Sequence, residues 1–175
     1  MRGIERLAAV NRSTPAMSEA LPNLPMPQTI MVRLIRIGVV GLGQFFEPVF
    51  RAIGLNENSF HVLCLLMASE RGEASPSELS ELVGTSRANM TRLLDELSTE
   101  KFINRLPEER DGRRSVVQIT GAGRKAATAA APKLAEPLRR AFSDLRPEEF
   151  AQLDALLRKV IMSFDKSASP LRASA

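Results

Sequence analysis

The sequence predicts a mainly α-helical protein that contains one short β-hairpin. Apolar residues recur at the spacing of one helical face, most clearly from Met90 to Leu97. Residues that favour helix starts and ends flank several of these segments. Two short runs, 102–106 and 115–119, read as strands, and the charged stretch between them carries the turn-forming pair Asp111-Gly112.

The N-terminal part is predicted to be a tail followed by one long helix. Residues 1–28 are polar and include four prolines, so we expect a disordered tail. From Thr29 to Ala52 the pattern indicates a helix with a weak apolar face, although its three glycines lower helix propensity. We interpret 29–55 as an N-terminal dimerisation helix.

Residues 56–120 are predicted to form several short secondary-structure elements in close succession. Asn56 can cap a helix that runs to Ser69, and Ser75 can cap a short helix that Gly84 ends. Thr85 or Ser86 can cap the next helix, which continues to about Lys101. The tight turn places this helix across the short one, and the hairpin follows as a wing. Between the first two of these helices, Arg71–Ala74 is expected to be a turn. This order of elements is that of a winged helix-turn-helix.

The C-terminal part is predicted to form two more helices. Thr120 can cap an alanine-rich helix over about 121–143, which Pro132 and Pro137 should bend or split. Pro147 can open a last helix over about 148–165. We interpret 121–166 as C-terminal dimerisation helices with apolar surface for a second copy, and 167–175 as a loose tail. The expected assembly is a homodimer.

One face of the helix that begins near Ser86 has the composition of a DNA-reading surface. If Met90 to Leu97 supply the inward positions, the small, polar and cationic residues of the first turns point outward. Asparagine can pair with adenine, arginine with guanine or phosphate, and small methyl groups can contact thymine. The predicted DNA contacts on this helix are Ser86, Arg87, Ala88, Asn89, Thr91 and Arg92. An ordinary solvated helix face remains the alternative.

The hairpin adds three arginines, Arg110, Arg113 and Arg114, at a tip that can reach a minor groove. We expect Asp111 to pair with Arg113 and set the wing. From Gly84 to Arg114 there are seven cations and six anions, a net charge of +1. The prediction of double-stranded DNA as a partner, at a pseudo-palindromic operator, therefore depends on placement and not on bulk charge. A hairpin that is charged only for solubility is the alternative.

The segment from Asp111 to Thr120 resembles the wing signature of the MarR (multiple-antibiotic-resistance regulator) family, and 79–103 is similar to that family's helix-turn-helix. The resemblance implies wing roles for Asp111 and Arg113 and groove-facing roles for 86–92. It also implies a repressor that a small, often aromatic or phenolic, ligand releases from DNA. Candidate ligand-binding residues are Phe46, Phe50 and His61. The chain departs from the family at Lys101, where glycine is common, and at Arg146, where a capping serine or threonine is usual.

Composition excludes several other classes. One cysteine and one histidine leave no intramolecular disulfide, no clustered metal ligands and no cofactor or catalytic constellation, so we expect no enzyme. Residues 37–46 imitate a dinucleotide-binding turn, but Phe46 stands where the third glycine is needed. Their uncharged stretch is too short to span a bilayer, and no signal peptide is apparent, so a cytoplasmic protein without a membrane partner is expected.

Two alternatives stay open at this point. The winged helix can serve as a protein–protein interaction module without DNA binding, although such modules usually present an apolar patch. Cys64 can make the protein a redox-sensing regulator, although its apolar neighbours favour burial of an inert thiol.

Overall fold

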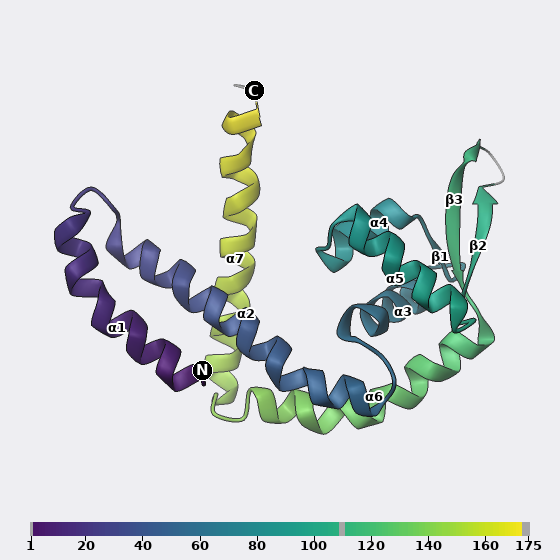
Figure 1. The fold of residues 1–175 in the computed structure, drawn as a ribbon, viewed down its shortest axis with the longest axis horizontal. Coiled ribbons are helices and arrows are strands. Elements are labelled where there is room, and N and C mark those ends of the chain that lie inside the picture. Colours follow the sequence, from purple (N-terminus) through teal and green to yellow (C-terminus); the bar gives the residue numbers. More distant parts are fainter. Residues whose placement is uncertain (1, 109–110, 173–175) are drawn as a thin grey trace. The chain divides into compact units, whose positions relative to one another are not determined.

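The structure is a computed structural model that describes the backbone of residues 2–108 and 111–172 and the side chains of 2–106 and 116–166. The chain consists of two compact units, Met1–Ala135 and Glu136–Ala175. The elements, labelled in Figure 1, are α1 (Gly3–Ala20), α2 (Met26–Ala52), α3 (Glu57–Ala68), β1 (Glu73–Ala74), α4 (Pro76–Val83), α5 (Arg87–Thr99), β2 (Ile103–Glu108), β3 (Asp111–Ile119), α6 (Gly121–Ala141) and α7 (Pro147–Arg172).

The hydrophobic core lies among α3, α4, α5, the sheet and the start of α6. The four α5 residues that the helical spacing placed inward are all buried, which confirms that prediction. Each large apolar side chain removed from water contributes about 1.5–3 kcal/mol. The buried members are Val62, Leu63, Leu66, Leu79, Met90, Leu93, Leu94, Leu97, Ile103, Val117, Ile119 and Ala127.

A three-stranded antiparallel sheet in the order β1-β3-β2 supports the wing. The β2–β3 hairpin was predicted, and both strands extend further toward the tip than the sequence pattern indicated. The prediction of a simple turn at Arg71–Ala74 is wrong in part, because Glu73 and Ala74 pair with β3. Two residues are too short for a period-2 pattern, so only the pairing with β3 makes them a strand.

The predicted helix starts of the first unit are confirmed by their hydrogen bonds. Asn56 Oδ1 accepts the Ser59 N–H at 2.7 Å, and Ser75 Oγ accepts the Glu78 N–H at 3.2 Å. Gly84 takes a left-handed conformation with φ of 72° and ends α4. Local side chains therefore satisfy the first free N–H groups of α3 and α4, as the sequence indicated.

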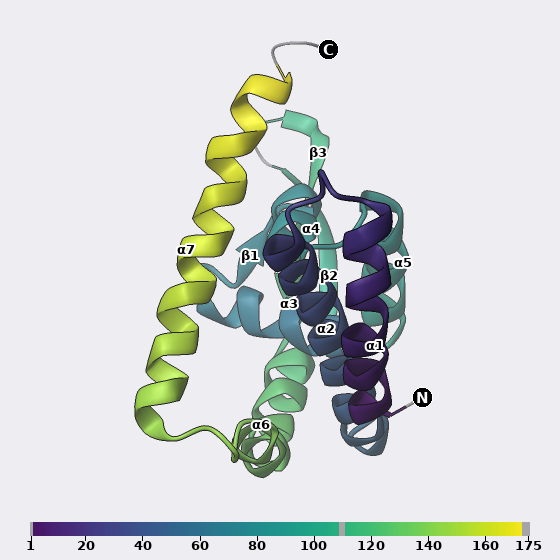
Figure 2. The same ribbon diagram turned by 90° about the vertical axis from the view of Figure 1, so that its left-hand side faces the viewer.

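The expectation of a disordered tail over 1–28 is corrected by helix α1, which packs beside α2 (Figures 1 and 2). Val10 is buried, and the Arg33 guanidinium of α2 donates to Ser13 Oγ at 2.8 Å. Prolines suggested disorder because they weaken an isolated helix. Here Pro27 lies in the first turn of α2, where its missing N–H costs nothing, and contacts with α2 support α1 around Pro15.

Helix α2 begins at Met26, three residues before the predicted start, and its glycines do not interrupt it. By length and composition alone, this 27-residue helix is apolar enough to cross a membrane. The prediction considered only the uncharged stretch 37–46, whereas the helix as a whole is long enough. One such helix is weak evidence for a membrane span, and most of the apolar surface of α2 is exposed in the single chain.

The C-terminal helices differ from the prediction in length and continuity, since α6 ends two residues earlier than predicted and α7 ends later. Helix α6 runs through Pro132 and Pro137 without a break, so the predicted split is wrong. Its alanine-rich sequence has the high helix propensity needed to offset the cost of proline. Helix α7 continues to Arg172, beyond the boundary at 166 that we set for a loose tail.

Candidate DNA-binding surface

Helix α5 begins with a side-chain cap at Ser86. Its hydroxyl oxygen accepts the Asn89 N–H at 3.2 Å, and the backbone of Ser86 is extended. The left-handed Gly84 turns the chain between α4 and α5 within two further residues. Local sequence thus determines where the exposed helix starts.

The residues predicted to face DNA lie on the exposed side of α5. Five of the six are exposed to solvent: Ser86, Arg87, Ala88, Thr91 and Arg92. Asn89 is half-buried. The Thr91 hydroxyl donates to the Arg87 carbonyl oxygen at 3.0 Å, so its proton is used within the helix. The other side chains on this surface are cationic or small, and such side chains suit a groove of double-stranded DNA.

Asn89 is hydrogen-bonded on both sides of its amide. Its Nδ2 donates to Thr85 Oγ1 at 2.7 Å, and its Oδ1 accepts from the Arg92 guanidinium at 3.1 Å. The sequence analysis offered Asn89 as a base-reading residue. In the structure the amide instead links the turn before α5 to Arg92 and restricts where that guanidinium lies.

Arg105 of β2 is a residue that the sequence analysis missed. One of its guanidinium nitrogens lies 2.6 Å from Asp95 Oδ1 and 3.2 Å from the Thr91 carbonyl oxygen. The wing strand is therefore tied to the exposed side of α5. Asp95 and Arg105 are ten positions apart on different elements, so no local sequence pattern relates them.

The predicted wing residues lie at the edge of what the structure describes. Arg110 lies outside the described residues. Asp111, Arg113 and Arg114 belong to β3 by their backbone, but their side chains lie outside the described ones. The contacts of these four side chains, including the expected Asp111–Arg113 pair, stay predictions.

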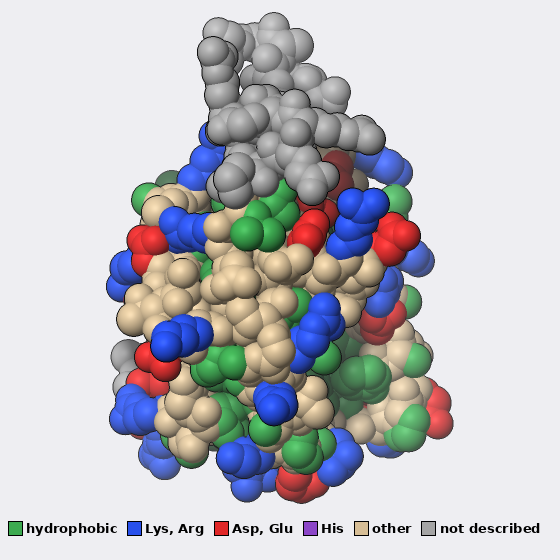
Figure 3. Space-filling model, turned by 90° about the vertical axis from the view of Figure 1, so that its right-hand side faces the viewer, with side chains coloured by type: hydrophobic (Ala, Val, Ile, Leu, Met, Phe, Trp, Pro, Cys, Tyr) green, Lys and Arg blue, Asp and Glu red, His purple; other side chains and the backbone are tan. Residues whose placement is uncertain are grey.

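Positive charge is not gathered into one patch on this side of the molecule. Figure 3 shows lysine and arginine side chains spread over the face beside the wing, with acidic side chains among them. Asp95 and Arg105 form an ion pair, in which the two charges cancel. Affinity for DNA would therefore depend on a few placed cations such as Arg87 and Arg92, as the low net charge indicated.

The three candidate ligand residues differ in their exposure to solvent. Phe46 and Phe50 are buried at 6% and 7% exposure, while His61 is exposed on α3. The rings of Phe46 and Phe50 have centroids 6.2 Å apart, and Phe50 continues the aromatic contact to Phe60 at 5.9 Å. The assignment of these three residues to one ligand-binding cleft stays a prediction. Phe50 alone lines a pocket of about 340 Å³, between the end of α2 and the start of α3, with Glu47 and Arg51 at it.

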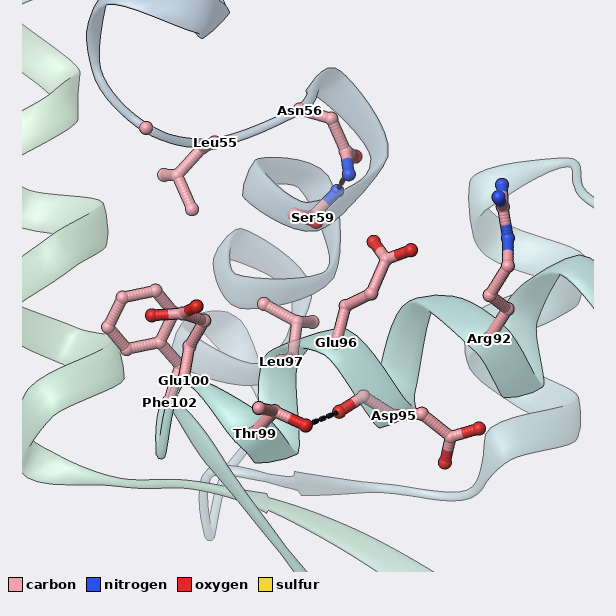
Figure 4. A pocket seen from close by; sticks show the side chains of 11 residues that line it. Leu55, Asn56, Ser59, Arg92, Asp95, Glu96, Leu97, Thr99, Glu100 and Phe102 are labelled. Carbon is pink, nitrogen blue, oxygen red and sulfur yellow. Dashed lines mark hydrogen bonds between the residues drawn. The ribbon is translucent and has the colours of Figure 1, made fainter.

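A larger pocket of about 470 Å³ lies between the α2–α3 connection and the C-terminal half of α5. Figure 4 shows Leu55 and Phe102 on one side and Glu96 directed toward Asn56. Arg92 also lines it, so this pocket borders the candidate DNA surface. Sequence analysis gave no sign of it, because its walls come from two stretches, 54–59 and 92–102, that are far apart in the sequence.

Cys64 is half-buried on α3, and burial raises the pKa of its thiol above the ordinary value. A raised pKa lowers the fraction of reactive thiolate at neutral pH. The redox alternative is thereby disfavoured.

A capped helix that follows a tight turn, exposes a small cationic face and lies against a β-hairpin defines a winged helix-turn-helix protein. The sequence profile of the MarR family matches residues 55–115. The chain is 30% identical over 144 residues to the transcriptional repressor MprA of Escherichia coli K12, which covers 82% of each chain. This chain belongs to the MarR family and is a transcriptional regulator of it.

Solved structures of similar fold support the architecture. Sco3205, a MarR family transcriptional regulator from Streptomyces coelicolor in complex with DNA, is 20% identical and matches with a TM-score of 0.73 over 80% of this chain and 89% of its own. Bordetella bronchiseptica BpsR, whose DNA binding is regulated by 6-hydroxynicotinic acid, is 23% identical and matches with a TM-score of 0.66 over 73% of this chain and 89% of its own. At these identities the likeness shows the fold.

Proposed function

We propose that this protein is a cytoplasmic, homodimeric repressor that binds a pseudo-palindromic operator and leaves it when a small ligand binds. The observation that carries the proposal is the exposed face of α5. It presents Arg87, Ala88 and Arg92 directly after a helix start, while the apolar face of the same helix is fully used in the core. A helix so placed can enter the major groove with its first turns, as in other winged helix-turn-helix proteins.

The second part of the proposal is the dimer. Large apolar side chains are exposed on several helices of the single chain, which is more than a monomer usually tolerates. A second copy that covers them would place two α5 helices on one duplex, about one helical turn apart. The exposed residues on α2, α6 and α7 include Met31, Val32, Val39, Val40, Leu138, Phe150, Leu156, Leu157, Ile161 and Phe164.

DNA binding is tested with random duplexes first and then with operators selected from a random pool. The wild-type dimer should bind random duplex weakly, and log affinity should fall linearly with log salt concentration. Arg92→Ala and Arg114→Ala should each fold and dimerise but lose about tenfold in operator affinity, since one base-edge or phosphate contact contributes about 1–3 kcal/mol. Arg12→Ala, an exposed arginine on α1, is the matched control and should bind as wild type does.

Two results would overturn this assignment. If both arginine variants bound like wild type, the reading surface would lie elsewhere. If the wild type failed to shift any duplex at low salt, the winged helix would serve as a protein–protein module instead. Light scattering of the free protein gives the oligomeric state, and a monomer at micromolar concentration would contradict the dimer.

Release by a ligand is supported by the pocket beside Phe50, which Arg51 and its ion-pair partner Glu47 also line. The resemblance to the family, and not the charge of this pocket, makes small aromatic acids the first ligands to test. Titration with 6-hydroxynicotinic acid and benzoate should raise the melting temperature and weaken operator binding together, because a ligand shifts affinity only through its preference for one state. Tight binding of either acid with unchanged operator affinity would contradict the proposal.

A further inference from the structure

Arg105 joins β2 of the wing to the outward side of α5, two elements that the proposed function requires to act on one duplex. A single guanidinium nitrogen contacts both Asp95 Oδ1 and the Thr91 carbonyl oxygen, at 2.6 and 3.2 Å. The Arg105 side chain is 38% exposed, so it lies largely against the protein. We propose that Arg105 is a positioning residue that fixes the wing relative to α5 and thereby determines operator specificity. This inference rests on the proposed DNA binding.

The strand geometry explains why the tie occurs at this residue. Side chains two positions apart point to the same face of a strand, so Arg105 lies on the face of Ile103. Ile103 is buried in the core against α5, and Arg105 is the next residue on that face toward the wing tip. Among side chains that the structure describes, no other residue of β2 hydrogen-bonds to α5. A two-stranded ribbon is weakly stable by itself, so a side-chain contact near its base restricts the orientation of the hairpin relative to α5.

The contact also explains an acidic residue on a surface proposed to bind DNA. Asp95 is 61% exposed on α5, and an unpaired carboxylate there would repel phosphates. Arg105 pairs with it. Neutralisation and positioning are different roles, and variants of Asp95 separate them. If neutralisation were the whole role, removing the carboxylate would improve binding to any DNA. If positioning is the role, removing it should reduce specificity.

The experiment compares selected operator with random duplex for the full-length dimer at five salt concentrations. In Arg105→Gln we expect the ratio of operator to random affinity to fall tenfold or more, while the salt slope stays that of wild type. Arg105→Lys should keep most of the ratio, since one nitrogen makes both contacts and an ammonium group can replace it. Arg87→Gln is the comparison, because Arg87 is an exposed candidate phosphate contact and its loss should reduce the slope by about 0.9.

A double-variant cycle completes the test. Asp95→Ala should lower the ratio as Arg105→Gln does, and the pair of changes should be no worse than either alone, because both remove one interaction. Melting temperatures within a few degrees of wild type would show that the fold is retained, as expected for a surface ion pair.

The outcomes separate this inference from the proposed function. If the wild type binds no DNA, the proposed function fails. If it binds, but Arg105→Gln lowers operator and random affinity equally and reduces the salt slope by about 0.9, Arg105 is a phosphate contact and the inference is wrong. An unchanged ratio in Arg105→Gln, or stronger binding by Asp95→Ala, would also overturn it.

Discussion

Replacing Lys101 by glycine should stabilise the protein. Helix α5 ends in a Schellman motif, in which the Phe102 N–H donates to the Leu97 carbonyl and the Lys101 N–H to the Ser98 carbonyl. The motif requires a left-handed residue at the position of Lys101, and its φ is 60°. The sequence departs from the family here, and the structure shows that lysine makes the turn that glycine usually makes.

The magnitude follows from two opposing terms. A left-handed conformation costs a residue with a Cβ atom about 1–2 kcal/mol relative to glycine. Glycine also increases the entropy of the unfolded chain, which offsets about 0.4–1 kcal/mol of that gain. The expected net stabilisation of Lys101→Gly is about 0.5–1 kcal/mol. For a chain of this size it corresponds to a rise in melting temperature of about 1–4 °C.

The assay is thermal and urea unfolding at one protein concentration, because the proposed dimerisation would make the melting temperature depend on concentration. Lys101→Ala keeps the strained backbone and should change stability little. Glu100→Gly is the matched control, since Glu100 has φ of −74° and glycine there should destabilise by up to about 1 kcal/mol. If Lys101→Gly were as destabilising as Glu100→Gly, the reasoning about the turn would be refuted.

Three further predictions concern packing, thiol reactivity and acid stability. Gly123→Ala should destabilise by about 1–3 kcal/mol in urea unfolding, because the added Cβ would clash with the Phe102 carbonyl oxygen, whereas Gly121→Ala meets open space and should not destabilise. Cys64 should react with a bulky thiol reagent more slowly than free cysteine at neutral pH and faster as pH rises, since burial raises its pKa; rapid labelling at neutral pH would contradict this. The pKa of Glu149 is lowered by side-chain and backbone hydrogen bonds from the residue before α7, so its stabilising effect is present above the ordinary glutamate pKa and is lost as pH falls through the lowered value. Circular dichroism of Glu149→Gln should therefore show less acid-dependent loss of helix than wild type, and an identical acid titration would count against that contact.

The start of α7 is capped by a side chain other than the usual one. A capping serine or threonine is usual before the last helix, but this sequence has Arg146 there. In the structure the Glu149 carboxylate accepts the Arg146 backbone N–H at 2.9 Å and its guanidinium at 2.8 Å. A carboxylate three residues into the helix can thus satisfy the same free donor.

The sequence by itself determined the features that depend on near neighbours. The caps at Asn56, Ser75 and Ser86, the left-handed Gly84 and the buried face of α5 all follow from side chains within four positions of one another. These local interactions set the order of elements, and with it the winged helix-turn-helix and the position of its exposed face.

Only the tertiary structure decided the features that join distant segments. Three features depend on contacts between segments that are far apart in the sequence: the pairing of Glu73 with β3, the packing of α1 against α2, and the ion pair of Arg105 with Asp95. A short window of sequence contains none of these contacts, so it cannot report their free energy. The hydrogen bond of the Asn89 amide to Thr85, four positions away, is local, yet the sequence pattern did not indicate it. Propensity and periodicity report what a segment favours alone, whereas packing decides which of its polar groups remain available to a partner.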